Sequence, residues 1–355
     1  MRKKTIGKAV AIIGLSSVLM SGCGLFGPSE ESNAPLDAPT PITVEQGNTS
    51  TNTQDPATGK EGTGEATVQT WQRTVYLFDS NGYVVPVSLV LPKEEGSAKQ
   101  VLKYMVKGGP VEMLKPQGFE PVLPEGTKVL GMTIKEGKAT IEFSSEFKNY
   151  NKQNEQKILE AITRSMTEFS NVKDIAIWVN GQQLEEMPQN GTPISLLTRE
   201  KGINTELAEG AHPGRTTAVT VYYQGMLDDK RSYFVPVTRL VPETDKIAEV
   251  VVQELIKGPK EGSQLISSLI RTTKLLGVEE KKDTLVVNLS DDILTFDSKK
   301  EANPEVLDSL VLSLIENTGV KQVQVLVEGK PLAQSGEQKY DQPVSRPATI
   351  NTFEF

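Results

Sequence analysis

The stretch "TVYLFDSNGYVVPVSLVLP" at residues 74–92 returns as "TVYYQGMLDDKRSYFVPVTRLVP" at residues 220–242. Other segments return in the same order, at offsets between 146 (Gly131 to Gly277) and 150 (Pro86 to Pro236). The further pairs are VKGGP (106–110) with IKGP (256–259), KVLGMTI (128–134) with KLLGVEE (274–280), ATIEFS (139–144) with LVVNLS (285–290), IAIWVNGQQL (175–184) with VQVLVEGKPL (323–332), and PIS…INT (193–205) with PVS…INT (343–352). A period this long predicts two similar domains, at 70–209 and 216–355, with a linker at 210–215.

Strands are indicated by alternation and by turn residues. Apolar residues alternate at 139–143 and at 285–289, which is the pattern of a half-buried strand. The segments 75–78 and 83–90 form an expected hairpin, because Ser80, Asn81 and Gly82 between them are typical turn residues. Pro86 and Pro236 predict that the second strand of each hairpin lies at a sheet edge or carries a bulge.

Two helices are expected in each repeat. Apolar residues recur at helical spacing over 98–106 and 158–169, and again over 247–255 and 307–315. Ser97 is expected to cap the first helix, and Asn303-Pro304 has the sequence of a helix start. Each repeat therefore reads β-β-α-β-β-α-β. The predicted fold class is α+β, with two tandem domains that are each a two-layer sandwich of sheet and helices.

The start of the chain has the pattern of a secretory signal peptide. The first eight residues carry four basic residues and no acid, and a mostly apolar run follows at 9–20, which is shorter than the ~20 residues of a spanning helix. Ser21-Gly22-Cys23 resembles a bacterial lipobox, although Met20 stands where leucine is usual. We expect residues 1–22 to be removed between Gly22 and Cys23, and Cys23 to carry a lipid. The alternative is a free cysteine that packs in a core.

Residues 24–70 are rich in Pro, Gly, Ser, Thr, Asn and acids, and no aromatic residue occurs between Phe26 and Trp71. Such a composition cannot bury enough apolar surface to offset the entropy of ordering, so 23–69 is predicted to be a disordered tether behind the lipidated cysteine. The net charge is −8 with acids and bases interspersed, which argues against nucleic acid as a partner.

The sequence offers little catalytic chemistry. The single histidine, His212, lies beside a proline between the repeats, and one histidine with a lipidated cysteine does not make a zinc site. Adjacent acids occur at 94–95, 185–186, 228–229 and 291–292, and their pattern is typical of solvated turns. The segment DSNG at 79–82 begins like a calcium-binding loop but lacks the later ligands. Trp71 and Trp178 are open to two interpretations, a sugar site or ordinary packing. We therefore predict no catalytic residues, no metal, no cofactor and no enzyme activity.

The lipobox, the tether and the two copies of VPV…LP, GP, LG and VxG…L together resemble the GerMN-domain family of sporulation and germination lipoproteins from endospore-forming bacteria. The resemblance implies domains similar to the ring-building motif of secretion systems. It also implies a lipid-anchored protein on the extracytoplasmic face of the mother-cell membrane, facing the forespore, which helps to assemble or localise a transenvelope complex. Cys23 matches the family's lipidation position, and the family supplies no catalytic residues.

Three functions follow from these observations. The leading hypothesis is a membrane-anchored scaffold for protein partners of the channel between mother cell and forespore. The second is a peptidoglycan-binding module of the spore envelope, with Trp71 and Trp178 as candidate contacts. The third, an enzyme acting on the spore wall, has the least support, because the features that repeat between the domains are packing residues and turns.

Overall fold

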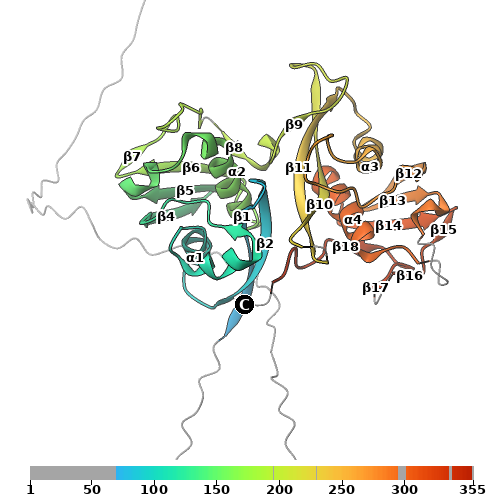
Figure 1. Ribbon diagram of the computed structural model, residues 1–355, viewed down its shortest axis with the longest axis horizontal. Coiled ribbons are helices and arrows are strands. Elements are labelled where there is room, and N and C mark those ends of the chain that lie inside the picture. Colours follow the sequence, from blue (N-terminus) through green and yellow to red (C-terminus); the bar gives the residue numbers. More distant parts are fainter. Residues whose placement is uncertain (1–68, 195, 229, 295–300, 336–337, 354–355) are drawn as a thin grey trace, which may run out of the picture. The chain divides into compact units, whose positions relative to one another are not determined.

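The computed structural model describes residues 69–355 except 195, 229, 295–300, 336–337 and 354–355, and the described residues belong to one compact unit. The expected signal peptide, Gly22, Cys23 and almost all of the expected tether lie outside the described residues. The α+β fold with two tandem domains is confirmed (Figure 1). Within the described part of the chain, no helix is long and apolar enough to cross a membrane.

The first repeat divides its strands between two sheets of its own, and its last strand, β9, joins the hairpin sheet of the second repeat. Its strands are β1 (Thr70–Asp79), β2 (Val84–Pro92), β3 (Phe119–Glu120), β4 (Val129–Lys135), β5 (Lys138–Phe143), β6 (Asp174–Val179), β7 (Gln182–Gln183), β8 (Leu197–Thr198) and β9 (Glu206–Leu207). Its helices are α1 (Ser97–Tyr104), α2 (Glu155–Met166) and the 3-10 turns η1 (Pro110–Gln117), η2 (Ser145–Lys148), η3 (Lys152–Asn154) and η4 (Arg199–Lys201). One sheet has the order β2-β1-β3 and the other β4-β5-β6-β7, with β8 also on β6.

The second repeat has the same plan. Its strands are β10 (Thr216–Met226), β11 (Ser232–Pro242), β12 (Leu275–Lys281), β13 (Thr284–Leu289), β14 (Gln322–Val327), β15 (Lys330–Pro331), β16 (Gln334–Ser335), β17 (Gln338–Lys339) and β18 (Val344–Ser345). Its helices are α3 (Ile247–Lys257), α4 (Pro304–Thr318) and the 3-10 turn η5 (Asp291–Ile293). The sheets have the orders β10-β11-β9 and β12-β13-β14-β15, with β18 also on β14.

The larger sheet of each repeat mixes parallel and antiparallel pairs. β4 and β5 form an antiparallel hairpin, β5 and β6 are parallel, and α2 is the crossover between them. β12, β13, α4 and β14 repeat this arrangement. Parallel neighbours require such a crossover, because a tight turn can only join antiparallel strands.

The hairpins and the α4 start were predicted correctly, but one helix start was not. Asn303 caps α4 by accepting a hydrogen bond from the Glu305 amide, and Pro304 is its first residue. Ser97 is not the cap of α1. Gly96 occupies that position with φ 74°, and the buried Ser97 hydroxyl has no hydrogen-bond partner among the described residues. A left-handed residue at the start of a helix favours glycine, since it has no Cβ.

The prolines lie where a sheet tolerates them. Pro86 is on β2, an edge strand, as predicted. Pro236 is on β11, which lies between β10 and β9 and is not an edge strand, but β9 pairs only with Arg239 and Leu240 and leaves Pro236 unopposed on that side among the described residues. The apolar faces of both repeats join one hydrophobic cluster, in which Val75, Leu77 and Ile162 are fully buried. The carbonyl groups of Pro86 and Pro236 accept hydrogen bonds from the other repeat.

Candidate functional site: the polar interface between the repeats

The residues singled out from the sequence do not come together. Trp71 is on β1 and Trp178 is on β6, in different sheets of the first repeat. Trp71 packs against the core with the Arg73 guanidinium 4.7 Å from its ring centroid. His212 is exposed in the loop between the repeats, where its carbonyl accepts a hydrogen bond from the Arg215 amide. The described residues contain no cluster of three or more metal-ligating side chains.

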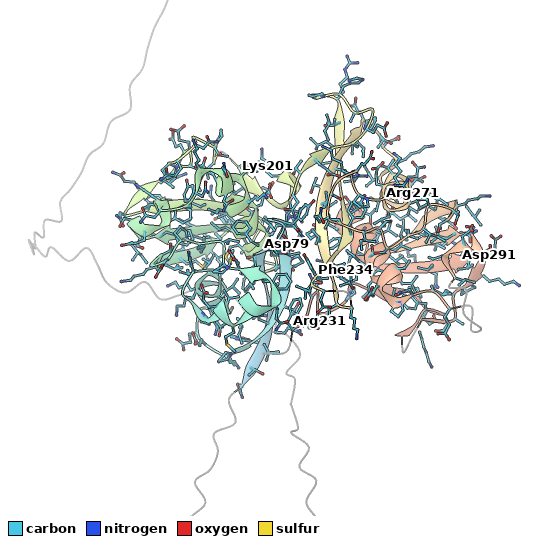
Figure 2. The ribbon with its side chains drawn as sticks, in the orientation of Figure 1. Asp79, Lys201, Arg231, Phe234, Arg271 and Asp291 are labelled. Carbon is cyan, nitrogen blue, oxygen red and sulfur yellow. The ribbon has the colours of Figure 1, made fainter. Side chains whose placement is uncertain are left out.

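The acid at the start of DSNG has a structural role. Asp79 is 4% exposed, and its Oδ1 accepts hydrogen bonds from the amides of Asn81 and Tyr83 at 2.9 and 2.8 Å. Its Oδ2 accepts a hydrogen bond of 2.7 Å from the hydroxyl of Tyr233 in the second repeat. The carboxylate therefore closes a turn and joins the repeats. Figure 2 labels Asp79 in the first repeat and Phe234 in the second.

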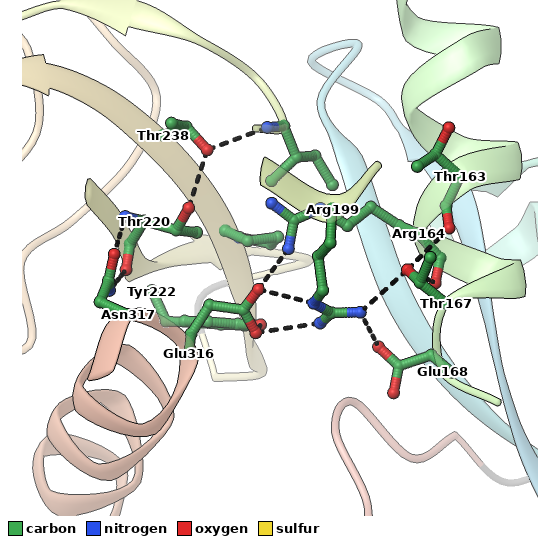
Figure 3. Close-up of polar contacts among 12 residues, drawn as sticks. Thr163, Arg164, Thr167, Glu168, Arg199, Thr220, Tyr222, Thr238, Glu316 and Asn317 are labelled. Atoms are coloured by element: carbon green, nitrogen blue, oxygen red, sulfur yellow. Dashed lines mark hydrogen bonds and ion pairs between the residues drawn. The ribbon is translucent and has the colours of Figure 1, made fainter. Parts of the chain in front are cut away.

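Charged side chains gather between α2 and α4. We call Arg164, Glu168, Arg199, Glu316 and Arg346 the ion cluster (Figure 3 draws all but the last by name). Arg199 makes a two-point contact with Glu316, with Nε–Oε1 at 2.7 Å and Nη2–Oε2 at 2.9 Å. Its Nη1 reaches Glu168 at 3.0 Å. Arg199 of the first repeat thus bridges one carboxylate from each repeat.

Glu316 is the centre of the cluster. Its side chain is 6% exposed and contacts Arg164, Arg199 and Arg346, whereas that of Glu168 is 25% exposed. Burial by itself would raise the pKa of Glu316, but the guanidinium groups of Arg199, Arg164 and Arg346 outweigh burial and hold that pKa well below its usual range. Glu316 is therefore ionised in the folded protein at neutral pH.

Most residues of the ion cluster, and two tyrosines beside it, occupy corresponding positions in the two repeats. Tyr76, Glu168 and Arg199 of the first repeat correspond to Tyr222, Glu316 and Arg346 of the second, at offsets of 146 to 148. The Tyr76 hydroxyl donates to Glu168 at 2.9 Å, and the Arg346 Nη1 to Glu316 at 3.1 Å. Burial and the neighbouring Glu168 raise the pKa of Tyr76.

Arg164 breaks this symmetry. The residue at its position in the second repeat is Leu312, and both side chains are buried. Glu316 is the ion-pair partner of Arg164, whose side chain is 2% exposed. The cluster holds three arginines and two glutamates, and Arg164 is the additional charge.

The clearest reciprocal contact is made by the asparagine of each INT segment. Asn204 accepts a hydrogen bond from the Val84 amide at 2.9 Å, and its Nδ2 donates to the carbonyls of Val84 and Pro236, each at 2.8 Å. Val84 belongs to the same repeat as Asn204 and Pro236 to the other. Each INT asparagine therefore ties together the second hairpin strands of both repeats.

Asn351 makes the matching set of contacts. It accepts a hydrogen bond from the Phe234 amide at 2.7 Å and donates to the carbonyls of Phe234 and Pro86, each at 2.8 Å. Asn204 and Asn351 have φ of 48° and 55°, a left-handed conformation that asparagine tolerates better than most residues. The proline carbonyls left free in β2 and β11 are the acceptors.

The isoleucine of each INT segment crosses to the other repeat. The Ile203 amide donates to the Thr238 hydroxyl at 2.9 Å, and the Ile350 amide to the Ser88 hydroxyl at 2.8 Å. The amides of Thr238 and Ser88 in turn donate to the carbonyls of the two isoleucines. The same patch thus faces itself across the interface, which is the arrangement of a twofold dimer. We call these INT contacts the reciprocal clasp.

The repeated INT is visible in the sequence, but the sequence alone indicates no role for it. Its signal was the asparagine between two β-branched residues, recurring at 203–205 and 350–352 after the last strands. The ion cluster left a weaker signal, because Glu168 and Glu316 follow apolar helical stripes and look like ordinary solvated helix ends. Neither pattern indicates by itself that its partner lies in the other repeat.

Comparison with known proteins agrees with this two-repeat architecture. Residues 74–185 and 220–333 each match the Germane family, described as sporulation and spore germination. This protein belongs to the Germane family. It is 40% identical over 365 residues to the spore germination protein GerM of Bacillus subtilis strain 168, covering 98% of this chain and 99% of the relative. A solved structure of the tandem GerMN domains of the sporulation protein GerM from Bacillus subtilis matches with a TM-score of 0.74 and 40% identity, over 80% of this chain and 100% of that one.

Proposed function

We propose that this Germane-family protein is a membrane-anchored lipoprotein scaffold, needed for sporulation and for germination of the resulting spores. It assembles or localises a transenvelope complex between mother cell and forespore, and it acts by binding rather than by catalysis. Membership of a sporulation and germination family, and 40% identity to a protein named for spore germination, support the role in spores.

The anchor in this proposal rests on the sequence. Residues 1–22 are the signal peptide, cleavage falls between Gly22 and Cys23, and Cys23 carries the lipid. The segment 23–69 then connects the membrane to the two domains. Two acyl chains hold a protein on a membrane far better than one, and lipoprotein processing supplies them. The proposed location is the extracytoplasmic face of the mother-cell membrane, facing the forespore.

The observation that carries the scaffold role is a pair of equivalent, exposed outer strands. β4 pairs only with β5, and β12 only with β13, among the described residues. Leu130 on β4 and Leu276 on β12 occupy the same position and are 52% and 46% exposed. An outer strand with an exposed large apolar residue is a surface on which a protein partner can dock. The reciprocal clasp holds the two surfaces in one body.

A photo-crosslinking amino acid placed at Leu130 or Leu276 in sporulating cells tests this role. We expect both positions to capture envelope proteins, and the exposed control position Lys201 on η4 to capture none. Capture should decrease in a Cys23→Ala background, because the unlipidated protein leaves the membrane.

Two results would contradict the scaffold. One is the absence of any captured envelope protein together with normal localisation of the complex when the gene is deleted. The other is recovery of wall glycan alone, which would favour the alternative, a peptidoglycan-binding module of the spore envelope.

A further inference from the structure

The two repeats differ in the chemistry between the second hairpin strand and the first helix. Arg239 on β11 is 7% exposed and pairs with Glu206 on β9 at 2.6 Å and with Glu254 on α3 at 2.7 Å. Glu206 lies at the end of the first repeat, on the strand β9 that pairs with β11. The residues at the three corresponding positions are all uncharged. Arg239 corresponds to Leu89, Glu206 to Phe353 and Glu254 to Tyr104, at offsets of 147 to 150.

The equivalent place around β2, where Ser88 pairs with Thr352, is thus an internal control. It has uncharged residues at all three positions, so this part of the fold does not require the ion pairs of Arg239. Removing two charges from water costs free energy that their attraction often fails to recover, and apolar replacements of such pairs are frequently neutral or stabilising. A buried arginine between two glutamates at only one of the two equivalent places therefore indicates a role other than stability.

The buried charges border a cavity. It has a volume of about 720 Å³, and its wall includes Arg239 and Glu254 together with the end of α3 and the loop after it. This volume lies within the range of pockets that hold small ligands. The buried charges are fixed, since Lys257 also pairs with Glu254 and the Arg239 guanidinium lies 5.5 Å from the centroid of the Tyr223 ring.

The mouth of the cavity carries charges of both signs. Lys260 and Arg271 supply two cations, and Glu209 and Glu261 supply two carboxylates; all four residues are exposed. None of the four forms an ion pair with a described residue. Figure 2 shows Arg271 on the second repeat. The mouth can therefore bind an anionic and a cationic group at the same time.

We propose that this cavity, which we call the Arg239 pocket, binds a short zwitterionic peptide. The ligand's carboxylate lies against Lys260 and Arg271, and its ammonium group lies against Glu209 or Glu261. The fixed Arg239–Glu254 pair forms the polar wall for its amide groups. Stem peptides of the cell wall and free small peptides share this chemistry.

Calorimetric titration of the purified protein with three forms of one peptide tests the proposal. The probes are alanyl-alanine, its C-terminal amide and its N-acetyl form, and a wall tetrapeptide containing diaminopimelate is the fourth. We expect the zwitterion to bind, and each blocked form to bind about tenfold more weakly or worse, because each loses a charged contact. Tighter binding of the wall tetrapeptide than of alanyl-alanine would identify the wall as the source, and the reverse order would identify free peptides.

Matched variants locate the site. Arg271→Gln changes an exposed residue and should weaken binding about tenfold or more without changing the melting temperature. Lys107→Gln, in the corresponding region of the first repeat, is the control and should leave binding unchanged. The triple variant Glu206→Phe, Arg239→Leu and Glu254→Tyr imports the residues of the three equivalent positions and should fold but not bind.

The proposal is overturned if no probe binds at millimolar concentration, or if the amide and N-acetyl forms bind as well as the zwitterion. Binding that survives Arg271→Gln unchanged, or that Lys107→Gln weakens equally, would also overturn it.

Discussion

Replacement of Glu316 by glutamine should destabilise the repeat that does not contain it. Glu316 lies on α4 of the second repeat, yet two of its three arginine partners, Arg164 and Arg199, belong to the first. Glutamine keeps the shape and removes the charge, so the buried Arg164 loses its ion-pair partner. Breaking a buried pair in this way costs ~3–5 kcal/mol of unfolding free energy.

The matched control is Glu168→Gln at the equivalent position. The Glu168 side chain is 25% exposed and pairs with Arg199, which keeps its contact with Glu316. Water screens a partly exposed pair, so we expect a loss of ~1 kcal/mol or less. The two substitutions are chemically identical. The difference between their losses of unfolding free energy therefore reflects the deeper burial of Glu316 and its larger number of arginine partners.

Urea unfolding followed by tryptophan fluorescence is the assay. Both tryptophans, Trp71 and Trp178, lie in the first repeat, so their signal reports the repeat opposite to the mutation. With a denaturant slope of ~3 kcal/mol per molar urea, Glu316→Gln should lower the midpoint by ~1 M or more. The reasoning is refuted if the fluorescence midpoint does not move, or if it moves no further than with Glu168→Gln.

A second substitution tests the cause. Arg164→Met removes the charge that Glu316→Gln leaves unpaired, and the second repeat already places Leu312 at that position. The double variant should therefore recover part of the lost stability, which a double-mutant cycle expresses as a coupling energy between the two residues.

Three further predictions concern the same interface. Asn351→Ala removes three hydrogen bonds, so the unfolding free energy should fall by ~2–3 kcal/mol and proteases should cut near the C-terminus sooner. Asn351→Gly should also be impaired, but less, because glycine adopts the left-handed backbone of this position without strain. Gly225→Ala would place a Cβ 2.4 Å from the Tyr233 ring, and this overpacking should lower the unfolding free energy by ~1–3 kcal/mol. The melting temperature should fall accordingly, and an unchanged melting temperature would show that the ring moves freely. The pKa of Glu316 is lower in the folded than in the unfolded protein. Its stabilisation is therefore complete above the unfolded pKa of about 4.3 and is lost progressively as the pH falls from there toward the lower folded pKa. Acid titration of the wild type should show a decline in stability over this range that Glu316→Gln reduces.

The local elements were predictable because their signals are local. Period-two alternation located β5 and β13, helical stripes located α2 and α4, and the Asn303-Pro304 start was correct. The separation of each hairpin into its own sheet was not predictable, since strand alternation says which face is buried and not which strand lies alongside.

The interface could not be predicted for a related reason. Asn351 contacts Pro86 across 265 residues, and Arg164 contacts Glu316 across 152. Polar residues between elements usually indicate solvent, and their sequence does not reveal a partner so far away. The repeat showed which residues correspond, and only the structure showed that corresponding residues face each other. The predictions for Gly22 and Cys23 lie outside the described residues and stay predictions.

The reciprocal clasp has a consequence for the order in which the chain folds. Ser88 receives its contact from Ile350, and Pro86 receives its contact from Asn351, so these bonds close loops of 262 and 265 residues. The N-terminal part of a chain leaves the ribosome first, so contacts that join it to residues far along the sequence form late. The edge of the first repeat's hairpin therefore stays open until residues 350 and 351 have been synthesised. A chain that stops before these residues should leave that edge exposed, so their loss is a defect of the first domain as much as of the second.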